Sequence, residues 1–174
     1  MKAFILEKNY IKKRVLLTLF FLGLSLLLPQ ILHFLPIGNL GKILRPINFS
    51  VILCGLILGK SSGVFMGLTS PLCSYLLFNM PQRPILAVFV IECVLLGFFA
   101  GLIKEKISNN YLNVLITIIM SLTTAFLILY IGNGFIPSLN LQILLNLLKT
   151  GYLGIIVQIV LIPILAEKIE KYIK

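Results

Sequence analysis

The sequence predicts an all-α integral membrane protein, a bundle of six transmembrane helices, from three observations. Of its 174 residues, 59% are apolar and only 11% are charged, whereas an ordinary soluble domain is about 25% charged. A soluble domain of this length would leave too many of these apolar side chains in water. The apolar runs are also continuous, whereas the strands of a membrane β-barrel alternate apolar and polar residues.

Six apolar runs each approach the length of a membrane-spanning helix, about 20 residues. The second run is short, and we expect it either to be tilted or to continue into the loop before it. Pro71 lies inside the third run, where a proline frees a backbone carbonyl and suits a bent helix beside a cavity. The expected spans are 14–35, 46–60, 62–79, 84–103, 111–132 and 141–166, within a single membrane domain that covers residues 1–174.

The segment 1–13 precedes the first span and mixes lysines with apolar residues such as Phe4 and Ile5. We expect it to lie as an amphipathic stretch on the cytoplasmic membrane surface. The apolar run from Val15 to Leu35 is too long for a signal peptide, and no cleavage site of small residues follows it. It is therefore expected to be retained as the first span.

The charge distribution predicts that both termini are cytoplasmic. Fifteen Lys and Arg residues face five acidic residues, for a net charge of +10. Inner loops of membrane proteins are enriched in Lys and Arg, so the excess indicates orientation and we expect no nucleic-acid partner. With this orientation, segments 36–45, 80–84 and 133–140 face outward. Eleven basic residues fall on inner segments, and four lie on or near outer ones: Lys42, Arg45, Arg83 and Lys149.

Small residues recur at every fourth position from the second span to the fourth. Residues four apart share a helix face, and small side chains there let two helix backbones approach closely. The pattern fits either a tight internal bundle or a surface that contacts a partner membrane subunit. The residues are Gly55, Gly59, Gly63 and Gly67, then Cys93, Gly97 and Gly101.

Polar side chains inside the apolar runs are concentrated in the outer half of the bundle. Glu92 lies about eight residues from the outer end of the fourth span, which is about 12 Å deep. An ionisable group at that depth normally faces a cavity or a partner. Three interpretations of Glu92 therefore stay open: it contacts a ligand, it transfers a proton, or it has a structural role. The amides are equally open to substrate binding or helix–helix hydrogen bonding. The candidate substrate-binding residues are Arg45, Asn48, Asn79, Arg83, Glu92 and Gln158.

No group of residues in the sequence supports catalysis. One His, no Asp and scattered Ser residues supply no catalytic triad or paired carboxylates. The cysteines Cys54, Cys73 and Cys93 lie inside apolar runs and form no Cys-x-x-Cys pair. We therefore expect no enzymatic activity, no metal site and no cofactor.

Four groups of segments form a pattern through their order and spacing. They are Pro46-Ile47-Asn48-Phe49-Ser50-Val51-Ile52-Leu53-Cys54-Gly55 with Leu58-Gly59, Gly63 and Gly67; Ser70-Pro71-Leu72 with Asn79-Met80-Pro81; Glu92 with Gly97 and Gly101; and Gly154 through Gln158 to Ile162-Pro163. Together they resemble the substrate-binding S components of energy-coupling factor (ECF) vitamin transporters. The resemblance covers most of residues 15–166.

The resemblance implies a six-helix bundle that captures a water-soluble vitamin or precursor from outside a bacterial cell. It also implies three partners: an ECF transmembrane coupling subunit in the cytoplasmic membrane and two cytoplasmic ATPase subunits. It places Asn48, Asn79 and Glu92 at or near the substrate, together with Arg83 and Gln158. Arg residues pair well with carboxylates, so Arg45 and Arg83 beside the cavity suit a carboxylate-bearing vitamin such as pantothenate.

The chain departs from the ECF pattern at two places. Asn48 stands where the closest relatives are expected to have His, and the Ala-x-x-x-Ala pair that docks the coupling subunit is missing. The first span offers Thr18, Gly23 and Ser25 as its small residues instead. Two other classes stay open: a standalone secondary carrier with Glu92 as its proton relay, and a small membrane enzyme or structural bundle.

Overall fold

The computed structural model of the chain describes residues 2–34, 40–132 and 141–173, and within these ranges the protein is helical with no strand. The prediction of an all-helical fold is confirmed for this part of the chain. Residues 36–39 and the predicted outer loop 133–140 lie outside the described residues. The helices are α1 (Lys2–Phe34), α2 (Leu40–Leu44), α3 (Pro46–Leu58), α4 (Lys60–Phe78), α5 (Arg83–Lys104), α6 (Asn110–Gly132) and α7 (Leu141–Ile173).

Five of the described helices, α1 and α4 to α7, are long and apolar enough to cross a membrane. Helix α3 has 13 residues and is about 20 Å long, which is less than the roughly 30 Å of a bilayer core. The short helix α2 directly precedes it, so helical structure continues into the preceding loop. A span count of six stays a prediction, because it depends on α2 and α3 crossing the membrane together.

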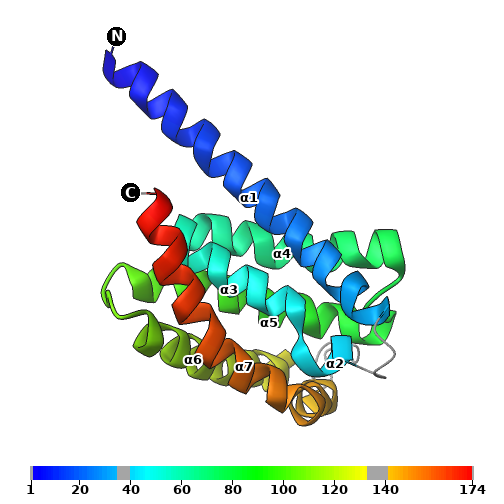
Figure 1. The fold of residues 1–174 in the computed structure, drawn as a ribbon. Coiled ribbons are helices and arrows are strands. Elements are labelled where there is room, and N and C mark those ends of the chain that lie inside the picture. Colours follow the sequence, from blue (N-terminus) through cyan, green and yellow to red (C-terminus); the bar gives the residue numbers. More distant parts are fainter. Residues whose placement is uncertain (1, 35–39, 133–140, 174) are drawn as a thin grey trace.

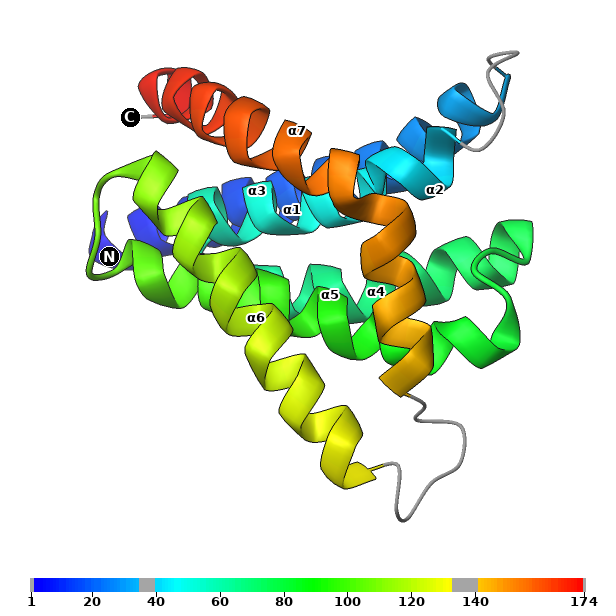
Figure 2. The same cartoon turned by 90° about the horizontal axis from the view of Figure 1, so that it is seen from below.

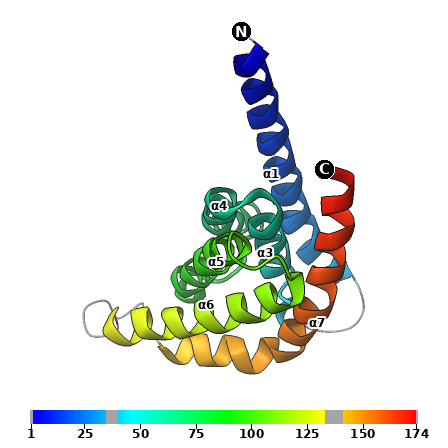
Figure 3. The ribbon, with the colours of Figure 1, turned by 90° about the vertical axis from the view of Figure 1, so that its left-hand side faces the viewer.

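Helix α1 lies at the edge of the bundle, whereas α5 lies at its centre. In the apolar part of α1 only 17% of the residues are buried, against 50% in α5. Helix α1 begins at Lys2 and runs without interruption past residue 14, so residues 2–13 continue the helix of the first span. Its 33 residues are about 50 Å long, and Figures 1 and 3 show its N-terminal part extending beyond the other helices.

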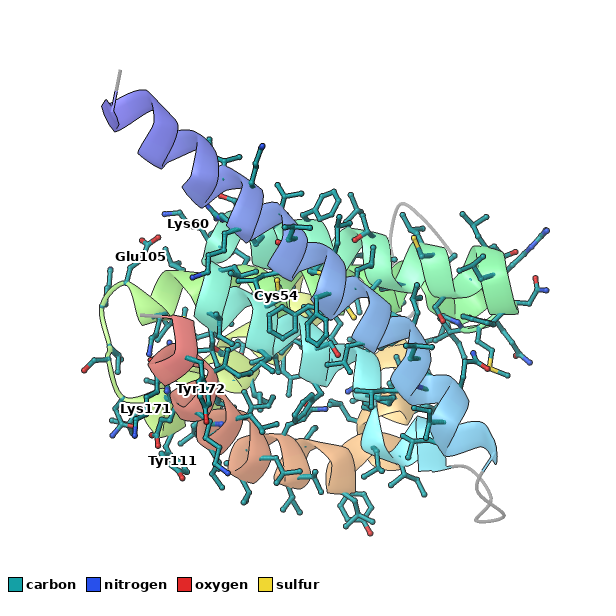
Figure 4. All side chains as sticks on the ribbon, turned by 45° about the horizontal axis from the view of Figure 1, so that its top comes forward. Cys54, Lys60, Glu105, Tyr111, Lys171 and Tyr172 are labelled. Atoms are coloured by element: carbon teal, nitrogen blue, oxygen red, sulfur yellow. The ribbon has the colours of Figure 1, made fainter. Side chains whose placement is uncertain are left out.

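The described ends of the chain lie at the same end of the bundle. Figure 1 shows the start of α1 and the end of α7 on the side of the α3–α4 and α5–α6 connections, and α2 and the α4–α5 turn on the opposite side. Figure 4 places Lys60, Glu105 and Lys171 at the end that holds the termini. There Lys60 and Glu105 form an exposed ion pair of 3.1 Å, and Lys104 pairs with Glu170 at 2.9 Å.

Glycines bring α3, α4 and α5 into backbone contact. A Cβ on Gly63 would collide with the backbone of Gly97, and a Cβ on Gly67 would collide with the backbone of Cys93. A Cβ on Gly101 would likewise collide with the backbone of Lys60. For these glycines the interpretation as a tight internal bundle is confirmed, since small residues let helix backbones approach this closely.

The apolar interior consists of two clusters of buried side chains. The larger cluster contains residues of α1 and of α3 to α7, including Phe21, Met66 and Ile162. The smaller one joins α5, α6 and α7 through Val88, Leu129 and neighbouring residues. Helix α7 contributes to both clusters because it bends (Figure 2), and it contains glycines and a proline, the residue types at which helices bend. The site described below involves residues of α3, α5, α6 and α7.

Candidate functional site

The α2–α3 junction is a single residue, Arg45, whose backbone is left-handed with a φ of 49°. Few residues other than glycine adopt this conformation. Pro46 follows as the first residue of α3, where the fixed φ of proline suits a helix start. Arg45 is only 5% exposed. The junction between the two helices therefore places a guanidinium inside an apolar bundle.

Helix α7 provides a face that fits closely against this junction. A Cβ at Gly151 would collide with the Arg45 side chain, and a Cβ at Gly154 would lie 2.7 Å from the carbonyl oxygen of Leu44. One turn further along the same face, Gln158 Nε2 donates to the carbonyl oxygens of Leu44 and Arg45 at 3.5 and 3.4 Å. Two glycines and one amide therefore hold the junction against α7.

The guanidinium of Arg45 forms a buried ion pair with Glu92 of α5, through Nη2 and Oε2. Glu92 is 1% exposed. The ring of Phe89, one turn earlier on α5, lies 5.8 Å from Arg45 Cζ, within the range of a cation–π contact. Arg45 Nε is buried and has no hydrogen-bond partner among the described residues, although an unpaired buried donor is costly. The guanidinium thus keeps one donor free for a further acceptor.

Asn48 lies one turn after Arg45, on α3, and is also buried. Cys93, the residue next to Glu92, donates from Sγ to Asn48 Oδ1 at 3.4 Å. This weak hydrogen bond connects α3 to α5 close to the ion pair. Asn48 therefore belongs to the same group of buried polar side chains as Arg45 and Glu92.

These side chains line one small cavity. Its polar lining consists of Arg45, Asn48, Glu92 and Gln158, and its apolar lining of Leu96, Ile118, Leu122 and Ile155. The cavity volume open to the centres of water-sized molecules is about 10 Å³, which is room for about one water molecule. Four of the six predicted substrate-binding residues meet here, from the α2–α3 junction, α3, α5 and α7.

The other two predicted residues, Asn79 and Arg83, do not line this cavity. Asn79 is exposed and ends α4 in a left-handed conformation with a φ of 55°. Arg83 is exposed at the start of α5, and its Nε donates to the hydroxyl of Tyr75 at 2.7 Å. This hydrogen bond raises the pKa of Arg83 above its ordinary value. The α4–α5 turn is therefore a separate polar surface, and only one arginine lies at the cavity.

A buried polar pair on α6 was not predicted from the sequence. Asn113 Nδ2 donates to the carbonyl oxygen of Ala100 on α5 at 3.3 Å, and Thr117 Oγ1 donates to Asn113 Oδ1 at 3.1 Å. Both side chains are fully buried. Their spacing of four residues inside an apolar run is a signal that they share a helix face. They connect α5 to α6 and do not line the cavity.

Two of the small residues of the first span face the protein's own bundle. Thr18 and Ser25 are buried, and Ser25 Oγ donates to Ser70 Oγ of α4 at 3.1 Å. Gly23 is different, since a Cβ there would have no neighbour within 4 Å. Of these three positions, only Gly23 is therefore open to contact with another subunit.

Comparison of the chain with protein-family models, with curated proteins and with solved structures gave no match in any of the three. Within the described ranges, no group of three or more His, Cys, Asp or Glu side chains could hold a metal ion. The buried polar side chains are therefore the feature of the molecule that bears most directly on its function.

Proposed function

We propose that this protein is the substrate-binding S component of an ECF-type importer, and that it captures a water-soluble vitamin or precursor from outside the cell. The observation that carries the proposal is the convergence of Arg45, Asn48, Glu92 and Gln158 on one buried cavity. Ligand sites combine apolar walls with a few convergent polar groups. Ionisable groups inside membrane-spanning helices are costly and rare, and substrate and ion pathways are among the sites that they mark.

The proposed topology has six spans and both termini in the cytoplasm, in a bacterial cytoplasmic membrane. The bundle places the chain's described ends on one side and the α4–α5 turn on the other (Figure 1). The inner side then carries most of the basic residues, in agreement with the orientation rule for membrane proteins. In this orientation the Arg45 junction is in the outer half, where an external solute would arrive.

The proposed function requires the cavity to enlarge, since its present volume fits about one water molecule. The α2–α3 junction is the element we expect to move. It contacts α7 across Gly151 and Gly154 and is held by Gln158 and by the ion pair to Glu92. Polar contacts of this kind can be exchanged for contacts with a polar solute, whereas interlocked apolar side chains cannot.

The proposal also includes partners that supply energy. We expect the protein to bind its solute alone and to transport it only with an ECF transmembrane coupling subunit and two cytoplasmic ATPase subunits. We propose binding and transport as its activity, and no catalytic step.

Reconstitution in liposomes tests this function directly. We expect solute uptake when the coupling subunit, the ATPases and ATP are all present, and none when any of these is omitted. Mass spectrometry of small molecules that co-purify in mild detergent would identify the solute. ATP-independent uptake by the chain alone would instead identify a secondary carrier, in which Glu92→Gln should abolish proton coupling.

A further inference from the structure

We infer that the cavity binds a solute that carries both an anionic and a cationic group, and that this solute inserts between Arg45 and Glu92. The inference rests on the proposed function, since it specifies the substrate class of the same site. The anionic group would contact Arg45, the cationic group would contact Glu92, and an aliphatic segment would lie between them. The structural basis is the ion pair that these two residues form inside the bundle.

A bound solute must leave both buried charges with a counter-charge. Arg45 and Glu92 are 5% and 1% exposed, and each is the ion-pair partner of the other. A solute with a single charge would neutralise one of them and leave the other buried without a counter-charge, which is strongly unfavourable. A solute with two opposite charges replaces one internal ion pair by two ion pairs, so no charge is left uncompensated.

Arg45 has a free hydrogen-bond donor that suits the anionic group of the solute. Nη2 contacts Glu92, while the adjacent Nε is buried and has no partner among the described residues. Nε and an Nη form the edge of a guanidinium that receives the two oxygens of a carboxylate. The guanidinium carbon Cζ lies over the ring of Phe89, 5.8 Å from its centroid. The anionic group of the solute is therefore assigned to Arg45.

The remaining lining of the cavity fits the segment between the two charges. Leu96, Ile118, Leu122 and Ile155 provide apolar walls from α5, α6 and α7. Asn48 and Gln158 are neutral, so they add hydrogen-bonding groups without changing the charge balance. A carboxylate-only vitamin, which the two arginines suggested, is less well matched because Arg83 is bonded to Tyr75 outside the cavity.

The test uses the purified full-length chain in mild detergent and three matched sets of probes. The sets are β-alanine with propionate and propylamine, 4-aminobutyrate with butyrate and butylamine, and 5-aminopentanoate with pentanoate and pentylamine. A ligand that binds only the folded protein raises the Tm. We expect at least one amino acid to raise the Tm, and to do so more than the acid and the amine of its own set. An equal rise with the acid, or no rise with any of the three amino acids, overturns the inference.

Two variants locate the binding. Arg45→Met combined with Glu92→Leu removes both charges, and such replacements of a buried ion pair by apolar residues are generally tolerated. This double variant should lose the rise in Tm, whereas the control Glu105→Gln, which removes an exposed ion pair at the end of the bundle that holds the termini, should keep it. A full rise in the double variant would show that the amino acid binds elsewhere and that the inference is wrong.

Failure of the inference and failure of the proposed function can be separated. ATP-dependent uptake of a solute with a single charge would overturn the inference and leave the S-component function intact. Binding of an amino acid probe to the cavity, combined with no uptake in the presence of the coupling subunit and ATPases, would support the inference and contradict the S-component function.

Discussion

Gly63 of α4 and Gly97 of α5 approach so closely that a Cβ on either would collide with the backbone of the other. Gly55 of α3 reaches the same point, because a Cβ on it would lie 2.5 Å from the carbonyl oxygen of Gly97. Three helices therefore meet where their backbones, rather than their side chains, are in contact. This region lies beside the polar cavity, because Leu96, the neighbour of Gly97, lines the cavity.

Gly97→Ala should strongly destabilise the protein, because the three atoms nearest the added methyl group belong to the backbone of Gly63, which cannot move independently of α4. Overpacking of this kind costs about 1–3 kcal/mol or more. Thermal unfolding in detergent measures the effect as a lower Tm. Gly23→Ala is the matched control, since nothing lies within 4 Å of its added Cβ, and its Tm should be unchanged or slightly higher. Equal Tm values for both variants would contradict the close contact of α4 and α5.

Glu92→Gln should also destabilise the protein, because it leaves the buried guanidinium of Arg45 without a counter-charge. Breaking a buried pair from one side costs about 3–5 kcal/mol, whereas replacing both partners by apolar residues costs much less. The combination of Arg45→Met with Glu92→Leu should therefore be more stable than Glu92→Gln alone. Unfolding of the single and double variants under identical conditions compares them.

Glu105→Gln is the control for that comparison. It removes the ion pair between Glu105 and Lys60, whose side chains are 52% and 44% exposed, respectively. Exposed ion pairs contribute about 0–1 kcal/mol to the free energy of unfolding. Its Tm should stay close to that of the unaltered protein. A loss of stability as large as that of Glu92→Gln would show that the ion pair at the cavity has no special role.

Gly151→Ala and Gly154→Ala should have different effects although both lie on the face of α7 that contacts the α2–α3 junction. The Cβ at position 151 would meet the middle of the Arg45 side chain, whose methylene groups can adjust while the guanidinium keeps its ion pair with Glu92. The Cβ at position 154 would instead meet the backbone carbonyls of Ile43 and Leu44. Gly151→Ala should fold with a modest loss of Tm and weaker solute binding. Gly154→Ala should lower the Tm more. A larger loss of Tm for Gly151→Ala than for Gly154→Ala would contradict the close contact of Gly154 with the backbone of the α2–α3 junction.

Much of the helical layout could be predicted from the sequence, because it depends on local signals. The apolar runs 84–103 and 111–132 coincide within one residue with α5 and α6. The glycines at four-residue spacing likewise indicated close packing, since spacing along a helix determines which residues share a face. The continuity of α1 before residue 14 was missed, because the basic residues there favour a surface segment as much as a helix.

The candidate site could be predicted only in part. Asn48, Glu92 and Gln158 were singled out as polar residues of the apolar runs, and a polar group in such a place needs a partner. Arg45 was singled out as a basic residue of an outer segment, and its burial was not predicted. The identity of each partner was not accessible, because the ion pair joins residues 47 positions apart and depends on how α2, α3 and α5 pack. Arg83 was assigned to the same site from its outer position, its charge and the family resemblance. Its hydrogen bond to Tyr75 depends on the geometry of the α4–α5 turn, which these signals do not determine.

Cysteine labelling should show that Glu105 and the two chain ends lie on the cytoplasmic side of the membrane, with Gln82 outside. In a chain whose Cys54, Cys73 and Cys93 are replaced by Ala, four single cysteines are introduced in turn: Lys12→Cys, Gln82→Cys, Glu105→Cys and Tyr172→Cys. All four positions are exposed, and Tyr172 and Glu105 lie at one end of the bundle (Figure 4).

A membrane-impermeant maleimide applied to intact cells should label only the cysteine at position 82. The other three positions should be protected in intact cells, because the basic residues around them favour the cytoplasmic side. After the cells are permeabilised, the reagent reaches that side and should label all four positions. Labelling of positions 12 and 172 from opposite sides would require an odd number of spans and would contradict the six-span topology. Labelling of position 105 from outside would reverse the orientation, and the Arg45 cavity would then be nearer to the cytoplasm.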